Sequence, residues 1–195
     1  MRSRAPLRPC HWGVLLLLLA ALLPPGRAAA QEPASEKPAR VEAAFLRNFA
    51  RYVNWPAHAF AGERSPWFVC ILGDSHFDDD LEATLRGRQE QGRSFEVVRV
   101  ARLDQLPACQ IVFVDFAQAS LRRAALAALK RQPVLTVGHA SEFLDEGGII
   151  RLVAGERIEM SINLDQARAA ALTIPSKMLE VSREVLENGA VRRLR

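Results

Sequence analysis

The first thirty residues constrain this chain most, because they have the pattern of a secretory signal peptide. Arginines at positions 2, 4 and 8 form a basic start, residues 14–23 are mostly Leu and Ala, and Ala28–Ala30 supplies the small residues that a signal peptidase needs. The apolar segment is too short to span a bilayer comfortably. We therefore expect cleavage after Ala30 and export of residues 31–195 as a soluble protein; an uncleaved membrane anchor is the alternative.

Removal of this leader changes the charge of the chain. The leader holds four of the 26 Lys and Arg residues and no acid, so the mature chain has 22 basic and 22 acidic residues. A mature charge near zero argues against a nucleic-acid or polybasic membrane role.

Cys70 and Cys109 remain in the mature chain as an even pair, in a compartment that permits disulfides. We expect a disulfide between them; two buried thiols on neighbouring strands are the alternative. Their separation, without a clustered histidine, argues against zinc.

Helical and strand patterns alternate along the mature chain. They predict an α/β fold: a single three-layer domain with a mixed central sheet flanked by helices and a C-terminal antiparallel hairpin. Trp67–Leu72 and Gln110–Val114 are continuous apolar runs, typical of strands covered on both faces. Strict alternation over Arg157–Asn163, after a turn at Gly155, predicts a hairpin with Ile149–Val153 that has one solvated face.

The other expected elements complete this domain. We predict strands over Ser94–Val100 and Pro133–Val137, and helices over Val41–Val53, 74–85, Gln118–Arg131, Leu164–Ala171 and from Pro175 to about Glu187. The expected organisation is a signal peptide (1–30), a flexible lead-in (31–40), one domain (41–188) and a tail (189–195).

Motifs of catalysis are not evident in the sequence. It contains no G-x-S-x-G elbow, no G-x-G-x-x-G loop and no Walker A loop, so we predict a protein that is not an enzyme and needs no cofactor. His76 among Asp74 and Asp78–Asp80 lacks metal-site spacing and is interpreted as a solvated helix start, with no metal.

Three polar residues follow predicted strands and form a candidate ligand pocket. Asp74, Asp115 and His139 each come at or just after the carboxyl end of a strand, where open α/β sheets bind their ligands. Ordinary loop polarity is the alternative interpretation. A ligand pocket at these residues would make the protein a small-molecule-binding module. An exported hydrolase built on the same residues is a further alternative.

Four segments together resemble the YfiR family of periplasmic proteins. They are VEAAFLRNFARYVNWP (residues 41–56), FVCILGDSHF (68–77), CQIVFVD (109–115) and FLDEGGIIRLVAGERIEMSINLDQARAAALTIPSKML (143–179). Their order and spacing span essentially the whole mature domain. The shared pattern runs from an aromatic helix ending in Trp-Pro, through Cys-x-Leu-Gly and a second Cys that opens an apolar strand, to Gly-Gly before a hairpin.

The resemblance implies a periplasmic regulator, not a catalyst. Such proteins repress an inner-membrane diguanylate cyclase by binding its periplasmic sensor part, are sequestered by an OmpA-type outer-membrane lipoprotein, and tend to form homodimers. It also implies that Cys70 and Cys109 switch between bonded and free states. Some members carry a second disulfide around the glycine-rich turn. This chain has no cysteine there, which predicts a looser loop between His139 and Gly148.

The hairpin and the helix after it are the candidate partner-binding surface. We expect apolar contacts from Ile150, Ile162 and Leu172, and a polar rim from Arg157 and Arg168. The alternative is that the apolar face of the hairpin is simply core, because alternating strands usually bury their apolar side. A small-molecule-binding module that feeds a sensor kinase or transport system is the competing hypothesis for function.

Overall fold

The computed structural model describes residues 38–74, 77–155 and 157–194. The expected signal peptide and most of the expected lead-in lie outside these residues, as does His76; the first helix begins at Pro38, within the lead-in. No helix among the described residues has both the length and the apolar character needed to cross a bilayer.

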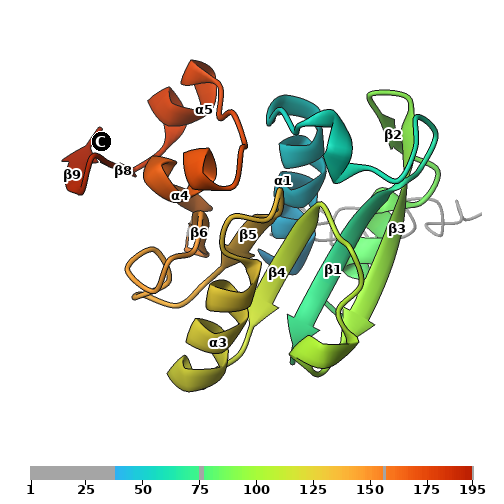
Figure 1. The fold of residues 1–195 in the computed structure, drawn as a ribbon, viewed down its shortest axis with the longest axis horizontal. Helices are drawn as coiled ribbons and strands as arrows, with labels where there is room; N and C mark the ends of the chain where they lie inside the picture. Colours follow the sequence, from blue (N-terminus) through green and yellow to red (C-terminus); the bar gives the residue numbers. More distant parts are fainter. Residues whose placement is uncertain (1–37, 75–76, 156, 195) are drawn as a thin grey trace, which may run out of the picture. The chain divides into compact units, whose positions relative to one another are not determined.

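The helices and strands alternate as the apolar patterns predict (Figure 1). In chain order they are α1 (Pro38–Tyr52), the 3-10 turn η1 (Ala57–Ala59), β1 (Trp67–Gly73), α2 (Asp80–Leu85), β2 (Gln89–Glu90), β3 (Arg93–Val100), the 3-10 turn η2 (Leu103–Gln105), β4 (Ile111–Asp115), α3 (Ala119–Leu129), β5 (Leu135–Gly138), β6 (Ile150–Val153), β7 (Glu159–Asn163), α4 (Leu164–Ala169), α5 (Ser176–Val181), β8 (Glu184–Glu187) and β9 (Ala190–Arg193).

The described strands form one mixed sheet in the order β2-β3-β1-β4-β5-β6-β7-β8-β9. Strands β3, β1, β4, β5 and β6 run parallel, whereas β2, β7 and β9 are each antiparallel to a neighbour. The hairpin predicted over residues 149–163 is present as β6 and β7, with Ile150 opposite Ile162. The prediction of an α/β domain with a mixed sheet is therefore confirmed.

Alternate residues of the central strands supply two separate apolar cores, one on each face of the sheet. Val69 and Ile71 of β1 belong to the core that contains α1, α2, α4 and α5. Cys70 and Leu72 belong to the core that contains α3. In Figure 1, α3 lies in front of the sheet and α1 behind it, which makes the predicted three layers. Burial on both faces explains why these strands have unbroken apolar sequences.

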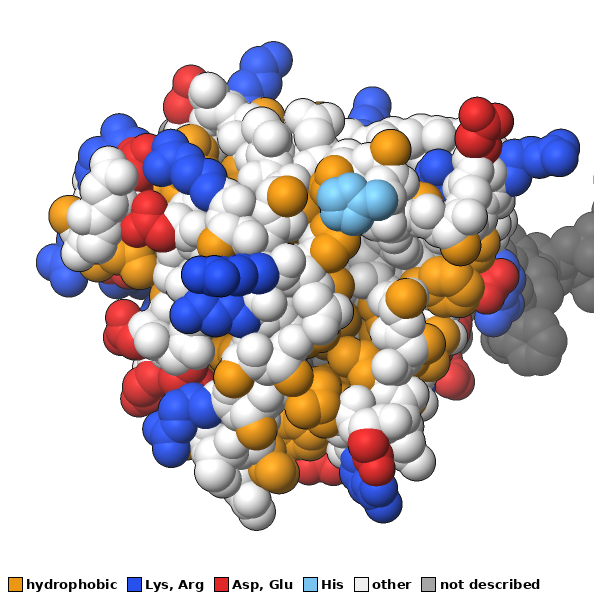
Figure 2. All heavy atoms as spheres, viewed as in Figure 1, with side chains coloured by type: hydrophobic (Ala, Val, Ile, Leu, Met, Phe, Trp, Pro, Cys, Tyr) orange, Lys and Arg blue, Asp and Glu red, His pale blue; other side chains and the backbone are white. Residues whose placement is uncertain are grey.

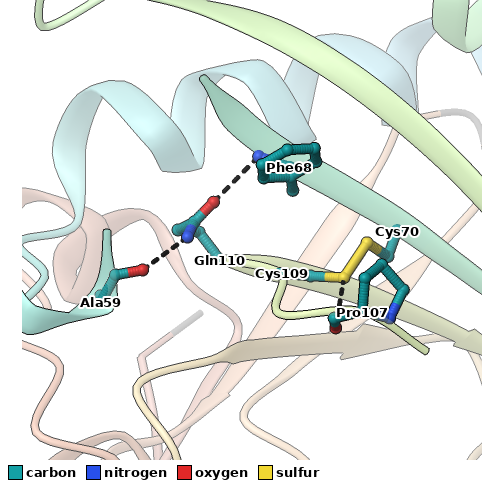
Figure 3. Close-up of a disulfide and its surroundings, with 6 residues drawn as sticks. All are labelled: Ala59, Phe68, Cys70, Pro107, Cys109 and Gln110. Atoms are coloured by element: carbon teal, nitrogen blue, oxygen red, sulfur yellow. Dashed lines mark hydrogen bonds between the residues drawn. A yellow bond between two sulfur atoms is a disulfide. The ribbon is translucent and has the colours of Figure 1, made fainter. Parts of the chain in front are cut away.

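A disulfide and one buried amide connect the strands at the centre of the sheet (Figure 3). Cys70 in β1 is bonded to Cys109, just before β4, with 6.1 Å between their Cα atoms. The neighbouring Gln110 is 4% exposed. Its side chain accepts a hydrogen bond from the Phe68 backbone N–H at 2.9 Å and donates to the Ala59 carbonyl at 2.6 Å. Gln110 thereby joins η1, β1 and β4.

The predicted helix from Pro175 to about Glu187 is wrong in its second half. Helix α5 ends at Val181, and residues 184–187 form β8, which pairs with β7 and turns back into β9. The two-residue turn between β8 and β9 is Asn188-Gly189, with φ of 54° and 71°. Asn-Gly is the preferred sequence for a hairpin turn with positive φ at both positions, so Gly189 ends a strand and not a helix.

The polar side of β7 also differs from the prediction of a solvated face. Ser161 and Asn163 are 2% and 3% exposed, and the chain turns directly from Asn163 into α4. The Asn163 side chain caps α4 by accepting from the Gln166 N–H at 3.0 Å, and it donates to the Leu144 carbonyl at 3.1 Å. Buried polar groups with partners of this kind look like surface residues in a sequence.

Candidate functional site

A pocket of about 620 Å³ lies at the carboxyl ends of β1, β4 and β5. Asp74, Asp115 and His139, the three residues singled out from the sequence, all line it. Strand β1 lies between β3 and β4 in the sheet. After β1 the chain forms β3 on one side of it and then crosses to form β4 on its other side, so the strand order reverses between β1 and β4. Doubly wound sheets bind ligands at such a reversal, outside the carboxyl ends of the strands.

The floor of the pocket requires a close approach of two strand ends. Gly73, the last residue of β1, has φ of 109°, and a Cβ at this position would lie 2.7 Å from the Asp115 carbonyl oxygen. That carbonyl accepts a hydrogen bond from the Asp74 N–H at 3.2 Å. Any side chain at position 73 would separate the strands, so glycine is needed to hold the two carboxylates at one edge.

His139 connects the pocket to the core behind it. Its ring packs edge-on against Phe113 with 4.8 Å between ring centroids, and its Nε2 lies 3.0 Å from Oε1 of Glu42. Glu42 is 1% exposed and comes from the buried side of α1. This contact could not be predicted from the spacing of the two residues in the sequence. The sequence does hold one signal: Glu42 lies four residues before Leu46 and seven before Phe49, so it falls in the stripe of α1 that faces the core.

One residue that lines the pocket, Arg122, belongs to a buried ion pair. Arg122 of α3 donates from Nε and Nη2 to the Glu146 carboxylate at 2.9 Å and 3.0 Å, and from Nη1 to the carbonyls of Phe116 and Ala117. Both side chains of the ion pair are less than a tenth exposed. Glu146 thus neutralises the guanidinium, which also lies 3.9 Å from the Glu142 carboxylate, and Asp74 and Asp115 place two more carboxylates on the lining of the pocket.

The loop between β5 and β6 is held without a second disulfide. Phe143 is fully buried between Gly138 and Gly148, where an added Cβ would lie 2.4 Å and 2.2 Å from its ring. The Phe143 carbonyl also accepts from the Gly148 N–H at 2.8 Å. A hydrogen bond from Ser141 lowers the pKa of the Glu142 carboxyl on the pocket rim. Close packing of Phe143 and the ion pair between Arg122 and Glu146 therefore hold this loop, which has no second disulfide.

The candidate partner-binding residues separate into two groups. Ile150, Ile162 and Leu172 are 0%, 0% and 2% exposed and belong to the core, so they do not supply surface contacts and the alternative interpretation of this face applies. Arg157 and Arg168 are exposed; Arg168 pairs with Glu187 at 2.6 Å, and Arg157 lines a hollow beside β7. The alternating pattern shows which residues share a strand face but not which face is covered.

Within residues 38–74, 77–155 and 157–194, no group of three or more His, Cys, Asp or Glu side chains has an arrangement suited to a metal ion.

Comparison with known protein families gives a clear match. The family model of the YfiR/HmsC-like proteins (DUF4154) matches residues 39–183.

This chain belongs to the YfiR/HmsC-like family. The match runs from α1 to the residue before β8 and so covers most of the described domain. Family membership makes the protein a periplasmic regulator in the context of cyclic di-GMP signalling. The family is regulatory and not catalytic, and it suggests interaction with a membrane sensor.

Comparison with curated proteins and solved structures adds little to this assignment. No curated protein matches the sequence. One solved structure, described as the ABC domain in complex with L-Trp from Streptococcus pneumonia, is similar with a TM-score of 0.49 and 13% identity. The alignment covers 76% of this chain and 60% of that one.

Proposed function

We propose that this YfiR/HmsC-like protein binds the periplasmic sensor part of an inner-membrane diguanylate cyclase and represses it. Cytoplasmic cyclic di-GMP then falls when the protein is present. The observation that carries the proposal is the family match over residues 39–183. The secretory leader expected from the sequence and the Cys70–Cys109 disulfide support an extracytoplasmic site of action.

Repression requires the protein to bind the inactive state of the cyclase more tightly than the active state. A tenfold preference corresponds to about 1.4 kcal/mol, which a few well-packed apolar contacts can supply. We further propose, from the family resemblance, that the protein acts as a homodimer and that an OmpA-type outer-membrane lipoprotein releases repression by sequestering it. The exposed Arg157 and Arg168 are candidates for the polar rim of the partner contact.

Deletion of the gene tests the main proposal. Cyclic di-GMP, measured by mass spectrometry in cell extracts, should rise on deletion and return to its original level on complementation with the full chain. A matched control expresses residues 31–195 without the leader, which should leave the nucleotide level high because the protein stays in the cytoplasm. An unchanged nucleotide level after deletion would contradict the proposal.

A second candidate function has its own supporting observation, the pocket that brings Asp74, Asp115 and His139 together. On this hypothesis the protein is a small-molecule-binding module that feeds a sensor kinase or a transport system. A ligand present at a hundred times its dissociation constant stabilises a protein by about 2.7 kcal/mol, and so raises its melting temperature by several degrees.

Thermal-shift measurements with a panel of periplasmic metabolites test this second candidate. The shift caused by a ligand should be lost in His139→Ala and in Asp74→Asn, and kept in His58→Ala, whose side chain is exposed outside the pocket. Asp74→Asn changes an exposed side chain and so separates lost binding from lost stability. Shifts that persist in both pocket variants would exclude the pocket as the binding site.

A further inference from the structure

Helices α1 and α5 enclose an apolar groove of about 450 Å³ that no part of the proposed function uses. Tyr52 at the end of α1 and Val181 at the end of α5 line it and are 49% and 60% exposed. Only two other large hydrophobic side chains in the described residues, Leu121 and Val191, are comparably exposed. Half of the exposed large apolar residues therefore lie along one groove, which is the pattern of an interaction site and not of scattered surface apolar residues.

The floor of the groove has an adaptable composition. Met160 of β7 and Met178 of α5 lie there, and they are the only methionines of the chain besides Met1. Methionine side chains are flexible and polarisable, and they are common on surfaces that bind another protein's apolar side chains. A second hollow of about 320 Å³, lined by Arg157, continues from the groove and shares Met160 and Val181 with it.

The rim of the groove is basic. Arg51 and Lys177 line the groove itself, and Arg157 lines the adjoining hollow. None of the three forms an ion pair with a carboxylate of the described residues, whereas Glu159, the carboxylate of the adjoining hollow, is already paired with Arg183. An apolar centre bordered by cations that no carboxylate of the described residues pairs with is complementary to an apolar segment that carries acidic side chains.

The opposite face of the sheet also carries hydrophobic side chains at its surface. In Figure 2, hydrophobic side chains come to the surface between α3 and the connection from β3 to β4. Partly buried Phe68, Leu103 and Leu106 belong to the core on that side. Nothing in their surroundings indicates what would cover them, so the α1–α5 groove carries the inference.

We infer that the α1–α5 groove binds an acidic amphipathic helix of another periplasmic protein. A helix fits better than an extended strand, because helices α1 and α5 border the groove and neither presents a strand edge to extend. A second copy of this chain fits worse, because a symmetric contact through this face would bring its unpaired cations together. The inference rests on the proposed function in placing the partner in the periplasm, and it shares Arg157 with the proposed polar rim.

A displayed library of random peptides, selected on the purified mature chain, tests the inference. Recovered peptides should be enriched in Asp and Glu beside Leu, Ile or Phe at helical spacing. Their binding, measured by fluorescence anisotropy, should weaken at least tenfold in Val181→Asp and about tenfold in Lys177→Glu. The matched controls Leu121→Asp and Lys130→Glu on and just after α3 should bind as the unchanged chain does. All four positions are exposed, so the melting temperature should not change.

Three results would overturn the inference: recovered peptides without acidic enrichment, equal weakening in the α3 controls, or a dimer in sedimentation measurements that Val181→Asp dissociates. The last result would mean that a second copy fills the groove. These outcomes are independent of the deletion experiment. A groove that binds no acidic helix leaves the cyclic di-GMP result unaffected, and an unchanged cyclic di-GMP level on deletion leaves the peptide result unaffected.

Discussion

Removal of the Cys70–Cys109 disulfide should destabilise the domain by an amount set mainly by the length of the loop that it closes. The two cysteines are 39 residues apart in the chain. For such a loop, the chain-entropy model gives about 4 kcal/mol at 25 °C. Strands β1 and β4 already pair directly, from Val69 opposite Ile111 onward, so the bond adds no strand contact and acts mainly on the unfolded chain.

The variant Cys70→Ala/Cys109→Ala tests this reasoning by thermal unfolding followed by circular dichroism. For a domain of this size, about 4 kcal/mol corresponds to a melting temperature lower by roughly 8–16 °C. The unchanged protein should show the same loss when a reductant is added, and the variant should not respond to reductant. A melting temperature that reductant leaves unchanged in the original protein would refute the reasoning, and so would a fall of only a degree or two in the variant.

Three further predictions concern buried contacts and pH. Gln110→Met should lower the free energy of unfolding by about 2 kcal/mol in urea titrations, because the buried N–H of Phe68 loses its acceptor, whereas Gln132→Met on the surface should change it little. Arg122→Met should lower it by about 3–5 kcal/mol, because Glu146 is left buried and charged; the double variant with Glu146→Leu should recover much of this, and no recovery would contradict the ion-pair explanation. Hydrogen bonds from the backbone N–H groups of Gly189 and Asn188 lower the pKa of Asp165 in the folded protein. The stabilisation that these bonds give the folded state is therefore present above pH ~4 and is lost as the pH falls through the lowered pKa. Amide exchange in β9 should accelerate there, and Asp165→Asn should remove this dependence.

The parallel strands could be predicted from the sequence because their environment is uniform. Trp67–Leu72 and Gln110–Val114 are buried on both faces, and only a strand between two layers requires an unbroken apolar run of that length. The pocket could be anticipated for the same reason. Asp74, Asp115 and His139 follow parallel strands, and the carboxyl ends of parallel strands meet at one edge of the sheet.

The C-terminal strands could not be assigned with the same ease. Glu184–Glu187 has a composition that suits a helix, and its conformation depends on pairing with Ser161–Asn163 of β7. The Asn188-Gly189 sequence is the one local signal of a hairpin turn in this segment. The burial of Ile150, Ile162 and Leu172 could not be predicted for a related reason, since the alternation of β7 shows that Ile162 faces one side without showing that helices cover that side.

Local patterns in the sequence by themselves determined the α/β class, the central strands and the pocket edge, because each depends on hydrophobic periodicity or on a strand end. Only the tertiary structure decided that Glu42 meets His139 and that Tyr52 and Val181 border one groove. These contacts join segments about a hundred residues apart or more, and no local pattern encodes which distant faces pack together. For the same reason the surface available to a partner is a property of the folded domain.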